Sequence, residues 1–268
     1  MINQLTVLIP CKNEVQNLEE CLASVRPVAD EILIADSGSQ DGTLDLIHRQ
    51  PDCRLIQRQY IHSGDFKNWA IPQASHEWVL VIDADERVTP ALTVEIQQRI
   101  AEARDVNGYW IPRDNYFLGQ RIRYSGWQSD RCLRLFRRDH AVYVGDNDHA
   151  EVQIASGRVA RLKAALQHDT FADYDSFFRK LNRYTSYQAR IWNESGRRAT
   201  FLDLLLAGPL RFFHSYVLRC GFLDGKAGLQ VCALTGFYSF MKRARLWERN
   251  RSDHSQRKPR STQSVRAA

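Results

Sequence analysis

Three carboxylates stand close together in the stretch VLVIDADERVTP, residues 79–90. Asp83 and Asp85 are two positions apart and Glu86 follows directly, after four consecutive apolar residues. This pattern suits a hard divalent cation such as Mg²⁺ or Mn²⁺, which proteins commonly hold with one or two carboxylates while phosphate oxygens complete the coordination. Asp and Glu also occur after strands simply as turn and cap residues, so both interpretations are open at this point.

The three carboxylates follow the last of four short apolar runs in the first third of the chain. The runs are residues 5–10, 31–36, 54–58 and 78–83, and polar residues follow three of them, at 10–13, 36–41 and 83–86. Segments with helical spacing lie between the runs, which predicts βαβ units and an α/β fold with a mostly parallel sheet flanked by helices. The carboxyl ends of parallel strands share one edge of the sheet, where ligands bind. We therefore expect the three polar groups to gather at that edge.

The remainder of the chain is expected to divide into further parts. A helix is predicted at about 90–104, after which an aromatic-rich and Arg-rich stretch reads as a β-rich half that could hold a second substrate. Within that stretch, RCLRLFRR alternates like a half-buried strand. The predicted parts are residues 1–105, the βαβ half; 106–170, the β-rich half of the same domain; 171–248, a helical region; and 249–268, a disordered basic tail.

The helical region contains an apolar stretch, residues 201–247. Its helices are predicted to break at Gly208-Pro209 and again around residues 221–228. With such breaks the stretch is expected to be too interrupted to span a bilayer, which takes roughly 20 apolar residues. It could lie on a membrane surface, or it could be a helical pair that packs on the core.

Charge and cysteine content disfavour a nucleic-acid-binding protein and a disulfide-rich secreted protein. The chain of 268 residues has a net charge of +6, but residues 242–268 alone hold nine Lys or Arg against two acids. The rest is close to neutral, which favours an anionic surface near the C-terminus over a basic groove for nucleic acid. Six cysteines without C-x-x-C spacing indicate a reduced, cytoplasmic setting, and the first apolar run is too short for a signal peptide.

Several ordered motifs resemble those of a known family. VLIPCKNEVQNLEECLASV, EILIADSGSQDGTLDLI, FKNWAI and WVLVIDADERVTPAL are similar to the nucleotide-sugar domain of inverting family 2 glycosyltransferases with a GT-A fold. SGWQSDRCLRLFRR, RKLNRYTSYQA and GFLDGKAGLQ continue the resemblance, which covers roughly residues 3–245. In detail the chain is similar to the lipopolysaccharide core glucosyltransferase subgroup.

The resemblance implies an enzyme that moves a hexose from a nucleotide-diphosphate sugar, UDP-glucose or a similar donor, to a hydroxyl of a glycolipid or lipopolysaccharide-core-like acceptor. It also implies Mg²⁺ or Mn²⁺ as cofactor. Together with the basic tail and the apolar helices, it predicts peripheral contact with an anionic membrane, at the cytoplasmic face of the inner membrane. The implied nucleotide-sugar-binding residues are Pro10, Asn13, Glu14, Asp36, Ser37, Lys67, Asn68, Asp83 and Ala84. The implied metal residues are Asp85, Asp83 and His168, of which His168 could instead be a core histidine.

An inverting transfer also needs a carboxylate that deprotonates the acceptor hydroxyl. Two regions qualify by resemblance, one ending in Asp130 and one containing Asp148 and Glu151. The subgroup has adjacent His-Glu in the second region, whereas this chain reads His-Ala-Glu. We therefore place Asp130 first and Glu151 second, with Asp148 as an alternate.

Two other functions remain open from the sequence. A phosphohydrolase of the haloacid dehalogenase type also has a D-x-D after an apolar strand, but its motif stands on the first strand and expects Thr or Val where this chain has Arg87. A non-catalytic membrane-surface protein is the other alternative. The paired carboxylates disfavour it, because they repel one another and have little structural use without a cation.

Overall fold

The computed structural model describes residues 4–145 and 150–257, with side chains up to residue 252. The chain divides into two compact units, each described below by itself. The first unit comprises residues 1–116 and 129–170, and the second comprises 117–128 and 171–268. Residues 117–128, which the sequence predicts as part of the β-rich half, belong to the second unit with the C-terminal helices.

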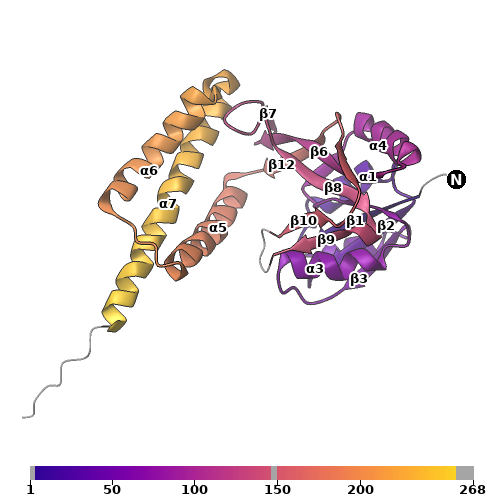
Figure 1. The fold of residues 1–268 in the computed structure, drawn as a ribbon, viewed down its shortest axis with the longest axis horizontal. Helices are drawn as coiled ribbons and strands as arrows, with labels where there is room; N and C mark the ends of the chain where they lie inside the picture. The colour runs from indigo at the N-terminus through magenta and orange to yellow at the C-terminus, as the bar shows by residue number, and fades with distance from the viewer. Residues whose placement is uncertain (1–3, 146–149, 258–268) are drawn as a thin grey trace, which may run out of the picture. The chain divides into compact units, whose positions relative to one another are not determined.

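The first unit is built on a sheet whose parallel part matches the predicted runs (Figure 1). Its parallel strands are β1 (Leu5–Cys11), β2 (Glu31–Asp36), β3 (Cys53–Gln57) and β4 (Trp78–Val81), in the order β3-β2-β1-β4. In register, Cys11 pairs with Asp36, and Leu8 pairs with Val81. The carboxyl ends of β1, β2 and β4 therefore meet at one edge, as predicted.

Two apolar layers cover the parallel strands, because alternate side chains of each strand point to opposite faces. One layer packs against α1 (Leu18–Val25), α2 (Thr43–His48) and α4 (Pro90–Glu102). The other packs against α3 (Ser63–Ala70) and the short helix Ile71–Gln73. All four residues of β4 are fully buried, so this strand anchors the start of the turn that follows it at the edge of the sheet.

Antiparallel strands extend the sheet beyond β4, in the order β4-β8-β6-β12-β5. They are β8 (Arg131–Arg137), β6 (Val106–Phe117), β12 (Leu166–Phe171) and β5 (Glu86–Val88), while β11 (Arg158–Arg161) pairs with β6. β9 (Ala141–Val144) follows the short helix Arg138–His140 and pairs with β10 (Glu151–Ile154). The centre of β8, Leu133 to Phe136, is buried on both faces, so the prediction of a half-buried strand was wrong.

The second unit is helical apart from β7 (Gln120–Ile122). Its elements are α5 (Tyr174–Glu194), α6 (Phe201–Phe213), the π-helical turn His214–Leu218, the short helix Gly221–Asp224 and α7 (Gly225–Arg257). The predicted break at Gly208-Pro209 is not there: Pro209 lies inside α6, and the helix continues into the π-helical turn. α7 runs to Arg257 where disorder was expected, and the rest of the predicted tail lies outside the described residues.

Small residues allow α6 and α7 to lie side by side (Figure 1). A Cβ atom placed on Gly236 would meet the Gly208 carbonyl oxygen at 3.0 Å, so the two backbones approach too closely for larger side chains there. Among the described residues, one helical stretch, Phe201–Leu218, is long and apolar enough to cross a membrane by length and composition. This corrects the expectation that no such stretch exists.

Candidate active site

The turn that carries the three carboxylates, residues 83–86 (the carboxylate turn), lies directly after β4. Arg87 holds the backbone of this turn in place. The Arg87 side chain is buried and donates hydrogen bonds to the carbonyl oxygens of Ala84 at 2.7 Å and Glu86 at 2.9 Å. It also reaches the Glu20 carboxylate at 3.2 Å. Arg87, which the sequence left unassigned, therefore holds the shape of the turn.

Asp83 faces two cations. One carboxylate oxygen accepts a hydrogen bond from Arg134, and the other lies 3.8 Å from Lys67 Nζ. Burial acts to raise the pKa of Asp83, but Arg134 and Lys67 outweigh it and hold that pKa well below its usual range. Asp83 is therefore a carboxylate with both oxygens engaged by positive charge.

Glu86 is a fully buried carboxylate at the start of β5. It accepts a hydrogen bond from the Asp83 backbone N–H at 3.0 Å. Its other oxygen lies 3.4 Å from Arg113 and 3.8 Å from Arg134. In the β5–β12 ladder, Glu86 pairs with His168. Glu86 thus ties the turn to two arginines and to the strand that carries the site histidine.

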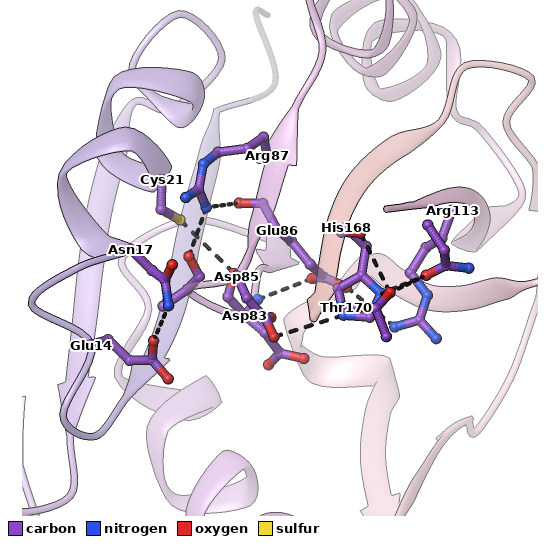
Figure 2. A network of polar contacts seen from close by, with 12 residues as sticks. Glu14, Asn17, Cys21, Asp83, Asp85, Glu86, Arg87, Arg113, His168 and Thr170 are labelled. Atoms are coloured by element: carbon purple, nitrogen blue, oxygen red, sulfur yellow. Dashed lines mark hydrogen bonds and ion pairs between the residues drawn. The ribbon is translucent and has the colours of Figure 1, made fainter. Parts of the chain in front are cut away.

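Asp85 is joined to Asp130 by a chain of polar contacts. His168 Nε2 lies 3.8 Å from the Asp85 carboxylate, and His168 Nδ1 lies 2.6 Å from Asn115 Oδ1. The Asn115 amide in turn donates to Asp130 at 2.8 Å, and Arg113 pairs with the other Asp130 oxygen at 3.0 Å. Figure 2 shows Asp85, His168 and Arg113 within this network. The structure therefore brings Asp130 and His168 into one cluster with the carboxylate turn.

The loop after β1 is held against the turn after β2. Asn13 has a left-handed backbone with φ of 57°, and its N–H donates to Ser39 Oγ at 2.8 Å. Asp36 is fully buried and accepts hydrogen bonds from the N–H groups of Gly38 at 2.9 Å and Ser39 at 3.1 Å. The Ser39 hydroxyl donates a hydrogen bond to the second Asp36 carboxylate oxygen. Asp36 thus shapes this turn, and its contact with the base or ribose stays a prediction. Pro10 pairs with Ala35 in the β1–β2 ladder, one residue before Asp36.

Two further predicted donor residues lie at the same edge. The Glu14 N–H donates to Thr43 Oγ1 at 2.9 Å, and the Glu14 carboxylate accepts from Asn17 at 2.7 Å. The Ser37 hydroxyl donates to the Cys11 carbonyl oxygen at 3.2 Å. These contacts join the ends of β1 and β2 into one polar rim.

α3 supplies the next two predicted residues, and they behave differently. Lys67 points to Asp83 and lies 5.1 Å from the centroid of the Tyr143 ring. Asn68 instead pairs with the Tyr143 backbone in both directions, at 2.8 Å each, and so holds β9 against α3. Of the two, Lys67 is the one directed to the carboxylate turn.

The remaining candidate bases are placed less centrally. Glu151 is exposed on β10, where it pairs with Val144 in the ladder. Asp148 lies outside the described residues. Arg134 of β8 is buried in the site. Arg137, at the end of β8, pairs with Glu77, and Arg138 of the short helix that follows pairs with Asp139.

Comparison with known proteins shows which family the chain belongs to. The model of Glycosyl transferase family 2 matches residues 6–161, more than half of the chain. The chain belongs to this family. The match contains the whole carboxylate turn as well as Asp130, and membership sets aside the phosphohydrolase and the non-catalytic alternatives.

Curated relatives of this family 2 glycosyltransferase match nearly end to end. A lipopolysaccharide core biosynthesis glycosyltransferase from Rhizobium meliloti is 29% identical, with 92% of this chain and 93% of the relative covered. An uncharacterised glycosyltransferase from Rickettsia felis is 24% identical, with 92% and 90% covered. Among solved structures, a mannosyltransferase from Pyrobaculum calidifontis in complex with GDP-Man and Mn²⁺ has a TM-score of 0.47 at 16% identity, covering 88% of this chain and 73% of that one.

The donor atoms of this family 2 glycosyltransferase fit a divalent cation that is completed by substrate. Among the described residues, no group of three or more His, Cys, Asp and Glu is placed to hold an ion alone. Asp85 Oδ2 and His168 Nε2 lie 3.8 Å apart, less than two metal–ligand bonds of about 2.1 Å laid end to end. His168 Nδ1 lies 2.6 Å from Asn115 Oδ1, which can only accept; a proton on Nδ1 would satisfy this contact and leave the Nε2 lone pair for a cation beside Asp85. Asp83 is less suited, because Arg134 and Lys67 engage its oxygens.

Sequence reasoning missed several members of this network. Arg113 and Asn115 stand on β6, and Thr170 on β12 donates to Asn115 Oδ1 at 3.1 Å. The alternation of apolar and polar residues gave no signal for these three residues, because their partners are distant in sequence. Glu86 was noticed in the motif but not assigned, since nothing local indicates that its carboxylate is completely buried.

Glu86→Gln is expected to lower the free energy of unfolding by about 2–3 kcal/mol, because Arg113 and Arg134 each lose the fully buried one of their two carboxylate partners and keep only Asp130 and Asp83. Urea denaturation measures the change. The matched control is Glu20→Gln, which removes a 78% exposed partner of Arg87 and should cost less than about 1 kcal/mol. Equal losses in the two variants would show that the buried network adds no stability.

Proposed function

We propose that this family 2 enzyme transfers a hexose, with inversion, from UDP-glucose or a similar nucleotide-diphosphate sugar to a hydroxyl of a glycolipid or lipopolysaccharide-core-like acceptor. The observation that carries the proposal is the network that joins Asp85 to Asp130 through His168 and Asn115. The network joins Asp85, the proposed cation ligand, to a second carboxylate at the same edge of the sheet. The similarity to a lipopolysaccharide core glycosyltransferase along nearly the whole chain supports the acceptor class.

The donor is proposed to lie along the rim formed by the ends of β1, β2 and β4. Asn13 and Glu14 would line the uridine end, beside the turn that Asp36 holds. Lys67, which reaches toward Asp83 from α3, would face the negative diphosphate. Arg134 is buried behind Asp83 and adds positive charge on the same side. The rim thus offers hydrogen bonds to a nucleoside and cations to a diphosphate.

In the reaction, Asp85 and His168 would hold Mg²⁺ or Mn²⁺ with the donor. The bound cation would supply charge neutralisation for the departing diphosphate. Lys67 would stabilise the same leaving group directly, since a fixed cation is worth more in a site shielded from water. Asp85 and Lys67 therefore have distinct tasks at the diphosphate.

Asp130 is proposed to take the proton of the acceptor hydroxyl. Burial acts to raise the pKa of Asp130, but its bonds to Arg113 and Asn115 outweigh burial and lower that pKa. Asp130 is therefore ionised at neutral pH, in the form that accepts a proton, although its low pKa makes it a weak base. Glu151, exposed on β10, is the second candidate for this role.

The acceptor class also suggests where the enzyme works. A glycolipid acceptor is presented at a membrane surface, and nucleotide sugars are soluble in the cytoplasm. We therefore place the enzyme at the cytoplasmic face of the inner membrane, in peripheral contact with anionic lipid.

A screen of UDP, GDP and TDP sugars tests the proposed function. We expect UDP release from UDP-glucose or a close relative, faster when extracted glycolipid acceptor is added, with the anomeric configuration of the product inverted as measured by NMR. Retention of configuration, or release that acceptor never stimulates, would contradict the proposal.

A further inference from the structure

The two units carry opposite charge. Residues 117–128 and 171–268 contain 20 Lys and Arg against 7 Asp and Glu, whereas the first unit contains 17 against 24. The basic excess is therefore not confined to the end of the chain, as the sequence suggested, but belongs to the whole helical unit. A surface of this sign attracts anionic surfaces and repels a second copy of itself.

α6 exposes an apolar face within this basic unit. It packs against α7 on the side of Gly208, and none of its residues is buried. Spacings of three and four residues place a set of exposed apolar side chains on the side opposite Gly208. The set is Leu202, Leu206, Leu210 and Phe213 of α6 and Val217 of the π-helical turn that continues it, between 41% and 62% exposed. So large an apolar stripe is uncommon on a soluble surface and indicates an interaction site.

A basic cluster lies in the same unit, gathered around Trp192. The cationic groups of Arg197, Arg243 and Lys242 lie 4.4, 5.4 and 5.8 Å from the centroid of its ring. Arg197 also lies 3.9 Å from Asp203, in the first turn of α6. The cluster therefore stands beside the N-terminal end of the apolar helix.

The cations of this cluster are short of negative partners. Burial first, and then repulsion by Arg243 and Arg211, lowers the pKa of Lys242. Burial and repulsion by Arg197 lower the pKa of Arg243 in the same way, and only Asp203 opposes them. Arg243 Nε is buried and has no hydrogen-bond partner in the part of the chain that the structure describes. An oxyanion such as a phosphate beside the cluster would relieve the repulsion among these cations.

We infer that the second unit is a membrane-docking module, in which the exposed face of α6 enters an anionic bilayer surface and the Trp192 cluster binds lipid phosphate. This inference deepens the proposed function, since it identifies the surface that would meet a glycolipid-bearing membrane. Like-charge repulsion disfavours a second copy of the chain as the occupant. Insertion across the bilayer is disfavoured because it would carry Asp203 and Arg211 into hydrocarbon. A helix with one apolar face and basic flanks lies in the interface instead.

Vesicle flotation of the full chain tests the docking module. The wild type is expected to float with phosphatidylglycerol/phosphatidylcholine vesicles and much less with phosphatidylcholine alone. The double variant Leu206→Asp, Leu210→Asp should lower the partition coefficient about tenfold or more, because each change removes buried methylene groups from the interface. The matched control, Val94→Asp, alters an apolar residue of the first unit that is 53% exposed and should float like the wild type.

The basic cluster is tested separately. Lys242→Gln is expected to weaken binding to anionic vesicles about fivefold, the share of one cation near such a surface. Arg49→Gln, which removes an exposed cation of the first unit, should change binding by much less. Binding of free inorganic phosphate at millimolar concentration by a protein that anionic vesicles do not retain would show a soluble anion site and overturn docking to lipid.

Hydrolysis of the sugar nucleotide without acceptor serves as the independent readout. It should be unchanged in all four variants, because none of the substituted residues belongs to the first unit's carboxylate network. Equal flotation with neutral and anionic vesicles, or a dimer in analytical ultracentrifugation that Leu206→Asp dissociates without any vesicle binding, would overturn the inference. Vesicle binding without any sugar transfer would instead sink the proposed function and leave the docking module standing.

Discussion

Asp85→Ala is expected to abolish sugar transfer while the fold is retained. Asp85 is the carboxylate best placed to hold the cation, 3.8 Å from His168 Nε2 and 24% exposed at the strand edge. Loss of a metal ligand that supports a leaving diphosphate should lower kcat/KM by a factor of about 1000 or more. Initial rates of UDP release with acceptor present measure the effect, and thermal unfolding checks the fold.

Two controls make this result specific. Asp45→Ala removes an exposed carboxylate of α2 and should leave kcat/KM within about twofold, since surface substitutions away from a site have small effects. Asp83→Asn should reduce activity and also stability, because Arg134 would lose the nearer of its two carboxylate partners. Near-normal turnover in Asp85→Ala would remove the metal role from this residue.

Asp130→Asn is the second substitution with a large expected effect. If Asp130 is the base, transfer should fall by a factor of about 100 to 10,000, the usual share of general base catalysis. Hydrolysis of the donor by water should fall much less, because leaving-group support at Asp85 and Lys67 is intact. The ratio of transfer to hydrolysis, measured from the same assay, reports this difference.

Glu151→Gln is the matched comparison for Asp130→Asn. It removes the charge of the other described candidate, which is exposed on β10, and is expected to leave the ratio of transfer to hydrolysis unchanged. The opposite pattern, with transfer lost in Glu151→Gln and kept in Asp130→Asn, would move the base to β10. Asp130 would then be a structural partner of Arg113 and Asn115.

The pH profile adds a check on the same residue. Arg113 and Asn115 lower the pKa of Asp130, so the basic form is present at neutral pH and is lost only as pH falls through that lowered value. We therefore expect kcat/KM to fall on acidification only below about pH 4, the ordinary pKa of Asp. A fall in kcat/KM that begins near pH 6 would require a different base.

The parallel half of the fold could be predicted from the sequence because its signals are local. The apolar runs mark strands directly, and the register of Cys11 with Asp36 confirms that their polar ends share an edge. The D-x-D turn was identifiable for the same reason, since Asp83 and Asp85 directly follow a buried strand.

The rest depends on contacts between distant segments. Asn115 orients His168 from a strand 53 residues earlier, and no spacing in the sequence encodes that pairing. The burial of Glu86 depends on Arg113 and Arg134, which stand on two other strands. The sequence predicts a helix break at Gly208-Pro209, yet α6 continues through it, and Gly208 packs closely on Gly236 of α7.

Isothermal titration of UDP with and without Mn²⁺ tests most directly the claim that Asp85 and His168 hold a cation together with a nucleotide diphosphate. We expect the wild type to bind UDP at least about tenfold more tightly with millimolar Mn²⁺, by roughly 1.4 kcal/mol. Asp85→Ala should bind UDP equally with and without the ion. A wild-type affinity for UDP that does not change with Mn²⁺ would contradict the account.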